Sequence, residues 1–282
     1  MEKYEMDKIR NIALFGHGDS GKTSLAEAML FNAGEIKRIG KVDDGRTLSD
    51  FDPDEQKRGI SVNATPLTFA WKDVKINLID TPGFADFVGE VVATTRVVDN
   101  AVFVISAVAG LEVQSEIIWK MADEKQLPRL ILINKMDREN ASFQRCLQQL
   151  EDVYGSKIVP FQLPIGEEHD FKGVVDLISN KAFLYSDEGK AEESDIPDDL
   201  IDLVESAREK LIEGAAEASD ELMEKYLEEE DISEEEVLSA LLDGISQVKV
   251  VPVLCGSATH NIAVDQFITT LVNALPSPAN IK

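Results

Sequence analysis

Short apolar runs alternate along this chain with stretches in which apolar residues recur every three or four positions. Strand patterns occupy residues 11–15, 64–70, 74–79, 101–105, 129–133 and 250–254. Helical patterns occupy residues 24–30, 113–124 and 264–274. Buried strands that alternate with helices predict an α/β fold, with a mostly parallel sheet and helices on both faces.

A different order of elements is predicted between residues 158 and 248. Strand patterns come first, at residues 158–164, 173–177 and 182–185, and helical patterns follow at 198–218, 220–230 and 234–242. Ser233 and Glu236 have the spacing of a capping box, which marks the start of the last helix. We therefore expect a core of residues 1–157 and 249–282 that carries an inserted α+β subdomain, residues 158–248.

The formal net charge is −25, and most of it belongs to the predicted insertion. Between residues 187 and 243 the chain has 23 acidic and four basic residues. The simplest interpretation of this segment is a solvated surface. An acidic chain is a poor ligand for bare nucleic acid, so we expect no direct binding to DNA.

The sequence contains no membrane segment that we can recognise. No apolar run approaches about 18 residues, and residues 1–10 lack the hydrophobic segment of a signal peptide. Cys146 and Cys255 stand in apolar contexts without metal-ligand spacing, which favours reduced thiols. We expect a monomeric, cytoplasmic protein without a membrane contact.

The segment Gly16-His17-Gly18-Asp19-Ser20-Gly21-Lys22-Thr23 matches the phosphate-loop pattern and lies between a predicted strand and a predicted helix. Glycine permits the path that turns backbone N–H groups toward a polyphosphate at a helix N-terminus. Lys22 would reach the outer phosphates, and the Thr23 hydroxyl would bind Mg²⁺. The candidate nucleotide ligands in this segment are Gly18, Asp19, Ser20, Gly21, Lys22, Thr23 and Ser24.

Two later segments are candidate partners of the phosphate loop. Residues 35–63 form a long polar connection, which in a compact domain is usually functional or mobile. Near its end, the Ser61 hydroxyl would supply a second Mg²⁺ ligand, although Ser61 alone is more simply an ordinary loop serine. Asp80 ends a predicted strand and would hold a metal-bound water. Gly83 would offer its N–H to a γ-phosphate, although residues 80–83 are by themselves also a good turn.

The motif Asn134-Lys135-Met136-Asp137 indicates which base is bound. A carboxylate at Asp137 can accept from both N1–H and the exocyclic amine of guanine, whereas adenine presents no such donor pair. Lys135 would lie along the base plane, and Asn134 would brace its loop against the phosphate loop. Further along the chain, Ser257 and Ala258 follow a predicted strand, and their backbone N–H groups would face the guanine O6.

Taken together and in this order, these motifs resemble those of translational GTPases. The chain is similar over nearly its whole length to the first domain of elongation factor G, and more closely to the elongation-factor-G-like group. The resemblance rests on residues 16–23, 58–61, 80–83, 134–140 and 256–258, with support from 162–166. It implies a phosphate-loop GTPase that uses GTP, GDP and Mg²⁺ and acts with the ribosome in translocation or recycling.

The resemblance also implies roles for particular residues. Thr23 and Ser61 would bind Mg²⁺ directly, Asp80 would hold the ion through water, and Asp19 would help to hold a monovalent cation. The inserted subdomain would meet the ribosomal stalk protein. Members of the family continue into further domains, so we expect this chain to be an excised domain or a truncated relative.

Two residues depart from the family pattern. Ser61 stands where the family has threonine, and serine also has a hydroxyl that can bind Mg²⁺. Phe84 stands where translational GTPases usually carry a histidine that positions the attacking water, a hydrogen bond that a phenyl ring cannot make. The catalytic set is then Lys22, Asp19, Gly83 and Phe84, and our hypothesis is that intrinsic hydrolysis is slow. The alternatives are a GTP-gated ribosome-binding switch with little hydrolysis and an ATP-dependent enzyme, against which the 134–137 motif argues.

Overall fold

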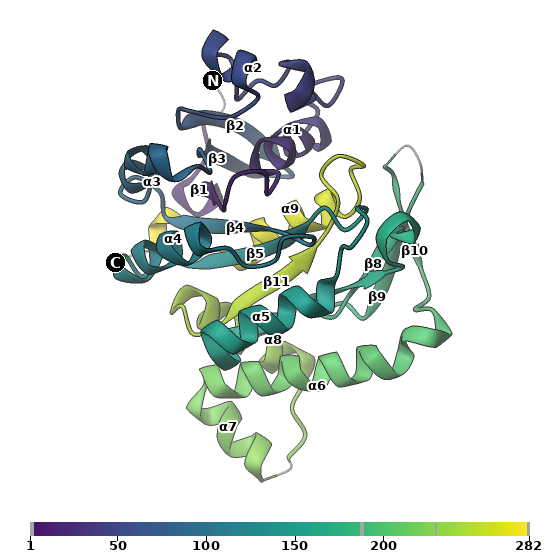
Figure 1. Cartoon of the computed structure of the whole chain (residues 1–282). Coiled ribbons are helices and arrows are strands. Elements are labelled where there is room, and N and C mark those ends of the chain that lie inside the picture. The colour runs from purple at the N-terminus through teal and green to yellow at the C-terminus, as the bar shows by residue number, and fades with distance from the viewer. Residues whose placement is uncertain (1–2, 187–188, 229, 281–282) are drawn as a thin grey trace.

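The computed structural model describes residues 3–186, 189–228 and 230–280, and its largest element is a seven-stranded sheet (Figure 1). The strand order is β2-β3-β1-β4-β5-β11-β6, and every neighbouring pair is parallel except β2 and β3. The strands are β1 (Ile9–Phe15), β2 (Thr65–Trp71), β3 (Val74–Asp80), β4 (Asn100–Ser106), β5 (Arg129–Asn134), β6 (Ile158–Pro160) and β11 (Val251–Cys255). The predicted α/β fold is confirmed.

Helices cover both faces of this sheet (Figure 1). Helix α1 (Lys22–Asn32) packs against α9 (Val264–Ala274) on one face, and α4 (Val113–Glu124) and α5 (Phe143–Tyr154) lie on the other. The sequences of α4, α5 and α9 explain their packing, because each of these helices has one apolar stripe, whereas α1 is buried on almost all sides. In α4 the buried residues are Ser115, Ile118, Trp119 and Ala122, which is the spacing of one helical face.

The central strands bring the predicted motifs to one edge of the sheet. Strands β4 and β5 are buried along their whole length, as expected for parallel strands covered on both faces. Parallel strands end at a common edge, and a motif follows the last residue of each of four strands: β1, β3, β5 and β11. The segments that begin at Gly16, Thr81, Lys135 and Gly256 therefore meet there, which is where ligands of open α/β sheets bind.

The inserted segment forms a second sheet and a group of helices. Its antiparallel strands have the order β10-β9-β8-β7 and the bounds β7 (Gln162–Ile165), β8 (Gly173–Asp176), β9 (Lys181–Tyr185) and β10 (Ala191–Ser194). Helices α6 (Ile201–Ala218), α7 (Asp220–Leu227) and α8 (Glu234–Ser246) follow, and Ser233 and Glu236 form the predicted capping box. Helix α6 packs against β6, α7 and α8.

Several elements differ from the sequence-based expectation, which included neither α5 nor a helix at residues 88–94. The strand β6 lies beyond residue 157, yet it pairs with β11 in the large sheet and not with the strands of the insertion. The polar connection 35–63 contains a helix, α2 (Pro53–Arg58), which begins with a capping box between Asp52 and Glu55. The strand β10 was not expected, because its sequence is polar and only its pairing with β9 identifies it.

A short helix, α3 (Val88–Thr94), follows the segment that begins at Thr81. Among the described residues, no helix is both long enough and apolar enough to cross a membrane.

Candidate functional site

The loop between β1 and α1 has the backbone path that its glycines predict. Gly21 has a φ of +92°, and a Cβ at this residue would lie 2.4 Å from Asn134 Nδ2. Lys22 Nζ donates to the carbonyl oxygens of Gly16 (3.1 Å) and His17 (2.8 Å), so the lysine folds back over the loop. The structure therefore holds the Lys22 ammonium inside the loop that the sequence predicts to bind phosphates.

The Lys22 ammonium also interacts electrostatically with the carboxylates of this site. Burial lowers the pKa of Lys22 to about 8, and the neighbouring Asp80 and Asp19 carboxylates act in the opposite direction. Thr23 and Ser24 follow in the first turn of α1, where backbone N–H groups have no intrahelical partner. A buried cation beside free helical N–H groups is suited to a polyphosphate.

The three predicted metal-site residues come together, although they are far apart in sequence. Thr23 Oγ1 lies 3.1 Å from Ser61 Oγ and donates to Asp80 Oδ2 at 2.7 Å. Ser49 Oγ donates to the same Asp80 oxygen at 2.6 Å. Asp80 Oδ1 is buried and has no hydrogen-bond partner among the described residues. Burial raises the pKa of Asp80 to about 6, and the Ser49 and Thr23 hydroxyls limit the rise.

These groups fit a magnesium ion, because hydroxyl and carboxylate oxygens are the ligands that Mg²⁺ prefers. Ser49 and its neighbour Asp50, which is 3% exposed, belong to this cluster and were not found by sequence reasoning. Ser49 carried no signal in the sequence, because nothing marks which serine of a long polar loop turns inward. Burial raises the pKa of Asp50, the Ser61 hydroxyl limits the rise, and the neighbouring Glu55 carboxylate adds to it.

Two buried glutamates hold the loop that carries Ser49 and Ser61. Glu27, on α1, accepts from the backbone N–H groups of Gly40 (3.0 Å) and Leu48 (2.6 Å). Glu55, on α2, accepts from the backbone N–H groups of Val62 and Asn63, both at 2.9 Å. Neither glutamate was a candidate from the sequence, since both resemble ordinary exposed positions of a helix.

Gly83 and Phe84 lie directly against the phosphate loop. A Cβ at Gly83 would come within 2.5 Å of Lys22 Nζ and 2.7 Å of Gly18 N, so only glycine fits. The Phe84 ring lies over Gly18, where an added Cβ would meet the ring at 3.0 Å. The ring is 37% exposed, so it covers the loop from the solvent side.

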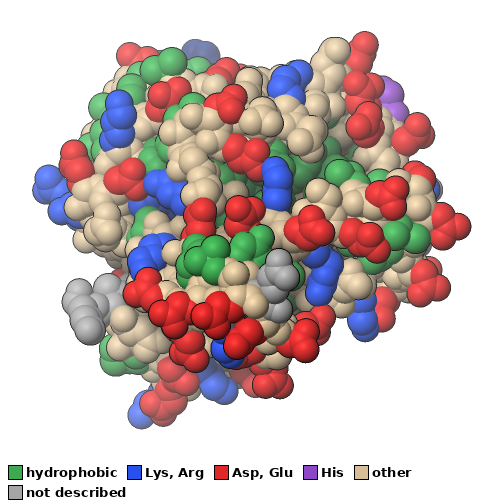
Figure 2. All heavy atoms as spheres, turned by 90° about the horizontal axis from the view of Figure 1, so that it is seen from below, with side chains coloured by type: hydrophobic (Ala, Val, Ile, Leu, Met, Phe, Trp, Pro, Cys, Tyr) green, Lys and Arg blue, Asp and Glu red, His purple; other side chains and the backbone are tan. Residues whose placement is uncertain are grey.

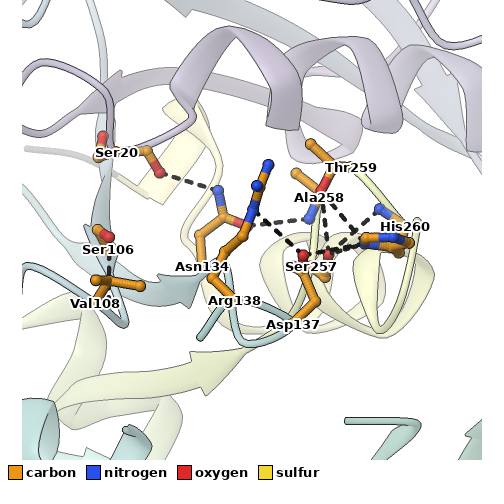
Figure 3. A network of polar contacts seen from close by, with 10 residues as sticks. All are labelled: Ser20, Ser106, Val108, Asn134, Asp137, Arg138, Ser257, Ala258, Thr259 and His260. Carbon is orange, nitrogen blue, oxygen red and sulfur yellow. Dashed lines mark hydrogen bonds and ion pairs between the residues drawn. The ribbon is translucent and has the colours of Figure 1, made fainter. Parts of the chain in front are cut away.

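Asn134 joins the phosphate loop to the loop after β11 (Figure 3). Its Nδ2 donates to the Ser20 carbonyl oxygen and its Oδ1 accepts from the Ala258 N–H, both at 3.0 Å. The Ser257 N–H donates to the Ile262 carbonyl oxygen, also at 3.0 Å. The predicted brace is present in the structure. The two amides expected to face the guanine O6 have protein partners here, so that role stays a prediction.

Asp137 is nearly buried, at 9% exposed, and its two oxygens have different surroundings (Figure 3). Its Oδ2 lies 3.2 Å from His260 Nδ1 and 3.5 Å from Arg138 Nε. Its Oδ1 has no hydrogen-bond partner within residues 3–186, 189–228 and 230–280. A buried carboxylate oxygen without a donor is suited to an N–H from a ligand. Lys135, next to it, has a φ of +65°.

A comparison with known protein families decides the identity of this domain. The family of the elongation factor Tu GTP binding domain matches residues 7–277. The chain belongs to this family. Members of the family are GTPases, and the family implies binding of a guanine nucleotide, usually with Mg²⁺.

A solved structure supports the same assignment of this GTPase domain. A crystal structure of a protein from Thermus thermophilus is 32% identical in sequence and superimposes with a TM-score of 0.91. The match covers 97% of the present chain and 41% of the Thermus chain. The GTPase domain therefore corresponds to less than half of that relative, and the expected elongation-factor-G-like resemblance is confirmed.

Proposed function

We propose that this domain binds GTP with Mg²⁺ and hydrolyses it to GDP and phosphate, within an elongation-factor-G-like protein that acts on the ribosome in translocation or recycling. The buried Asp137 carboxylate carries this proposal, because its Oδ1 has no donor among the described residues. Asn134, in the same motif, bonds to the phosphate loop and so holds this carboxylate near the predicted phosphate site. Guanine offers two N–H donors in the position that such a carboxylate requires.

Catalysis would consist of positioning and charge neutralisation. Lys22 and the amides of the loop would hold the β- and γ-phosphates, and the Gly83 N–H would donate to a γ-phosphate oxygen. Thr23 and Ser61 would bind Mg²⁺, with Asp80 holding it through water, and the ion would neutralise charge on the phosphates. Asp19 would help to hold a monovalent cation.

Phe84 supports a slow intrinsic rate. Its ring covers Gly18 and offers no donor or acceptor to a water molecule. Positioning of a reacting water is commonly worth roughly 10²–10⁴ in rate. Phe84 therefore also supports the second candidate function, which is a GTP-gated ribosome-binding switch that hydrolyses little GTP.

We propose that the inserted subdomain binds a protein partner on the ribosome and that this partner is the stalk protein. The helices of the subdomain expose acidic side chains at Asp202, Glu205, Glu209, Glu213, Glu217, Asp220, Glu221, Glu224, Glu234, Glu235 and Asp243. Leu227, 72% exposed, lies among them. Many acidic side chains, with basic and hydrophobic ones between them, lie on the face of the molecule drawn in Figure 2. We further propose a cytoplasmic monomer that binds neither DNA nor membranes. Its core would comprise residues 1–157 and 249–282, together with β6, which pairs with β11 in the large sheet.

Turnover of GTP and ATP, measured side by side with and without ribosomes, tests this function. We expect binding of GTP only, slow hydrolysis by the domain alone, and stimulation by ribosomes in a full-length form. Tight GTP binding with negligible turnover in both conditions would favour the switch, and equal use of ATP would contradict both candidates.

A further inference from the structure

The inserted subdomain touches the loop that follows β11, between Gly256 and Ala263. Tyr185, the last residue of β9, donates its hydroxyl hydrogen to Asp265 Oδ1 in the first turn of α9. Burial and the Asp265 carboxylate raise the pKa of the same phenol, and the backbone of Ala263 lies close enough to favour its ionised form and so to limit the rise. The phenol is thus bonded to Asp265 and placed beside Ala263, at the point where the loop becomes a helix.

That junction is held in a backbone conformation that needs support. Ala263 is fully buried with a φ of +64°, and Asn261 has a φ of +56°. A left-handed conformation is unfavourable for alanine because of its Cβ, so surrounding contacts must maintain it at Ala263. The contacts of Tyr185 lie directly on this strained turn.

A second contact of the insertion reaches the same loop at its tip. Gly189, in the turn between β9 and β10, has a φ of +71°, and a Cβ there would lie 3.0 Å from Asn261 Nδ2. Asn32 Nδ2, at the end of α1, donates to Asn261 Oδ1 at 2.5 Å. Asn261, in the loop after β11, therefore contacts α1 of the core on one side and Gly189 of the insertion on the other.

The other base-reading loop is held from the insertion as well. The backbone N–H of Asn140, three residues beyond Asp137, donates to Glu168 Oε1 at 2.9 Å. This contact is exposed, so we expect it to contribute less than the Tyr185 contacts. Both loops that would surround a guanine ring are in this way attached to one subdomain.

We propose that Tyr185 is a positioning residue for guanine recognition, through which the inserted subdomain holds residues 256–263 in the base-reading conformation and sets the lifetime of the bound nucleotide. The inference rests on the proposed function and adds a determinant outside the nucleotide-binding core. Tyr185 acts through Ala263, Asp265 and the loop, and needs no contact with the nucleotide.

The test compares Tyr185→Phe with Tyr226→Phe in the whole chain. The substitution at 185 removes only the hydroxyl, whereas Tyr226 lies on α7 of the same subdomain and is 42% exposed. Dissociation of a fluorescent GDP is followed after addition of excess GDP, well below the melting temperature of each variant. We expect Tyr185→Phe to release GDP about threefold to tenfold faster and Tyr226→Phe to match the wild type.

Two further measurements separate positioning from general stability. Tyr185→Phe should raise the KM for GTP with kcat unchanged, which is the signature of lost uniform binding. Asp265→Ala should also speed release, and adding it to Tyr185→Phe should have little further effect, because the two residues act as a unit.

Release of GDP by Tyr185→Phe at the wild-type rate would overturn the inference, and so would a lower melting temperature with an unchanged release rate. Failure of the wild-type chain to bind GDP at all would instead overturn the proposed function. The two failures are therefore distinguishable.

Discussion

Asp137 presents one carboxylate oxygen to His260 and Arg138 and keeps the other without a donor from the described protein. At the scale of the residue, this asymmetry assigns different tasks to the two oxygens. One is anchored, and the other is left for a ligand. An anchored carboxylate loses less conformational freedom on binding, which favours selectivity.

Asp137→Asn should exchange the preferred base. The amide would offer a donor where guanine also has one, so we expect GDP affinity to fall at least about 100-fold. Xanthosine diphosphate, whose base carries a carbonyl oxygen in place of the amine, should bind more tightly than to the wild type. Equilibrium titration with fluorescent nucleotides measures both. Glu139→Gln, at a neighbouring exposed residue, is the control, and unchanged GDP binding by Asp137→Asn would argue against guanine recognition at this site.

Phe84→His should speed hydrolysis in a single-turnover assay by about tenfold or more, because the imidazole can hydrogen-bond the attacking water. Phe84→Leu is the matched control: it uncovers Gly18 but offers no hydrogen bond, so its rate should stay near that of the wild type. If the histidine variant hydrolyses GTP no faster, with or without ribosomes, the idea that Phe84 limits the rate is wrong.

At the scale of elements, α2 determines where Ser61 lies. The helix has only six residues, too few to persist alone in water. Its stability comes from the capping box at its start and from Glu55, which is 1% exposed and holds Val62 and Asn63. The position of the Ser61 hydroxyl beside Thr23 is thus a consequence of one buried glutamate.

Glu55→Ala should weaken Mg²⁺-dependent GTP binding more than it weakens GDP binding. In GTPases such a loop is ordered by the γ-phosphate and its Mg²⁺, and GDP has no γ-phosphate. Loss of the buried acceptor should also lower the free energy of unfolding by about 1–3 kcal/mol. Asp54→Ala, an exposed change on the same helix, is the control. Magnesium titrations and urea unfolding measure the two effects, and equal weakening with both nucleotides would contradict a contribution of Ser61 that is specific to the GTP complex.

The sequence predicted the elements whose pattern is local. The bounds expected for α4 and α9 agree with the structure, because their apolar stripes are continuous. The strand β10 was missed because Ala191–Ser194 has no apolar pattern and pairs only through its backbone. Ser49 and Glu27 were missed for a related reason, since their partners lie in segments that come together only in the folded chain.

At the scale of the whole molecule, two buried thiols link stability to pH. Burial raises the pKa of both Cys146 and Cys255. In the unfolded chain a thiol loses its proton near pH ~8.5, whereas the buried thiol keeps it, so the unfolded state is favoured as the pH rises. The stabilising effect is complete below that pH and is lost above it.

Between about pH 8 and pH 9.5 the Cys255 thiol should therefore lower the free energy of unfolding by about 1 kcal/mol, and Cys146 acts in the same direction. The lowered pKa of Lys22 acts in the opposite direction over this range. Urea unfolding of the wild type and of Cys255→Ala measures the thiol contribution as the difference between their two pH slopes. An unchanged slope in that variant would mean that other groups dominate the pH dependence.

Because β6 pairs with β11, the inserted segment is the connection between two neighbouring strands of the large sheet. The two strands are parallel neighbours, with Val251 beside Ile158. The chain therefore leaves the carboxyl end of β6 and must return to the opposite end of the sheet to enter β11. Parallel neighbours require a crossover of about a dozen residues or more, and a tight turn cannot join them. The subdomain is therefore an enlarged crossover connection between two neighbouring parallel strands, and not an insertion into a dispensable surface loop. Any shortened version of this domain that keeps β6 and β11 must keep a linker that spans the length of these strands.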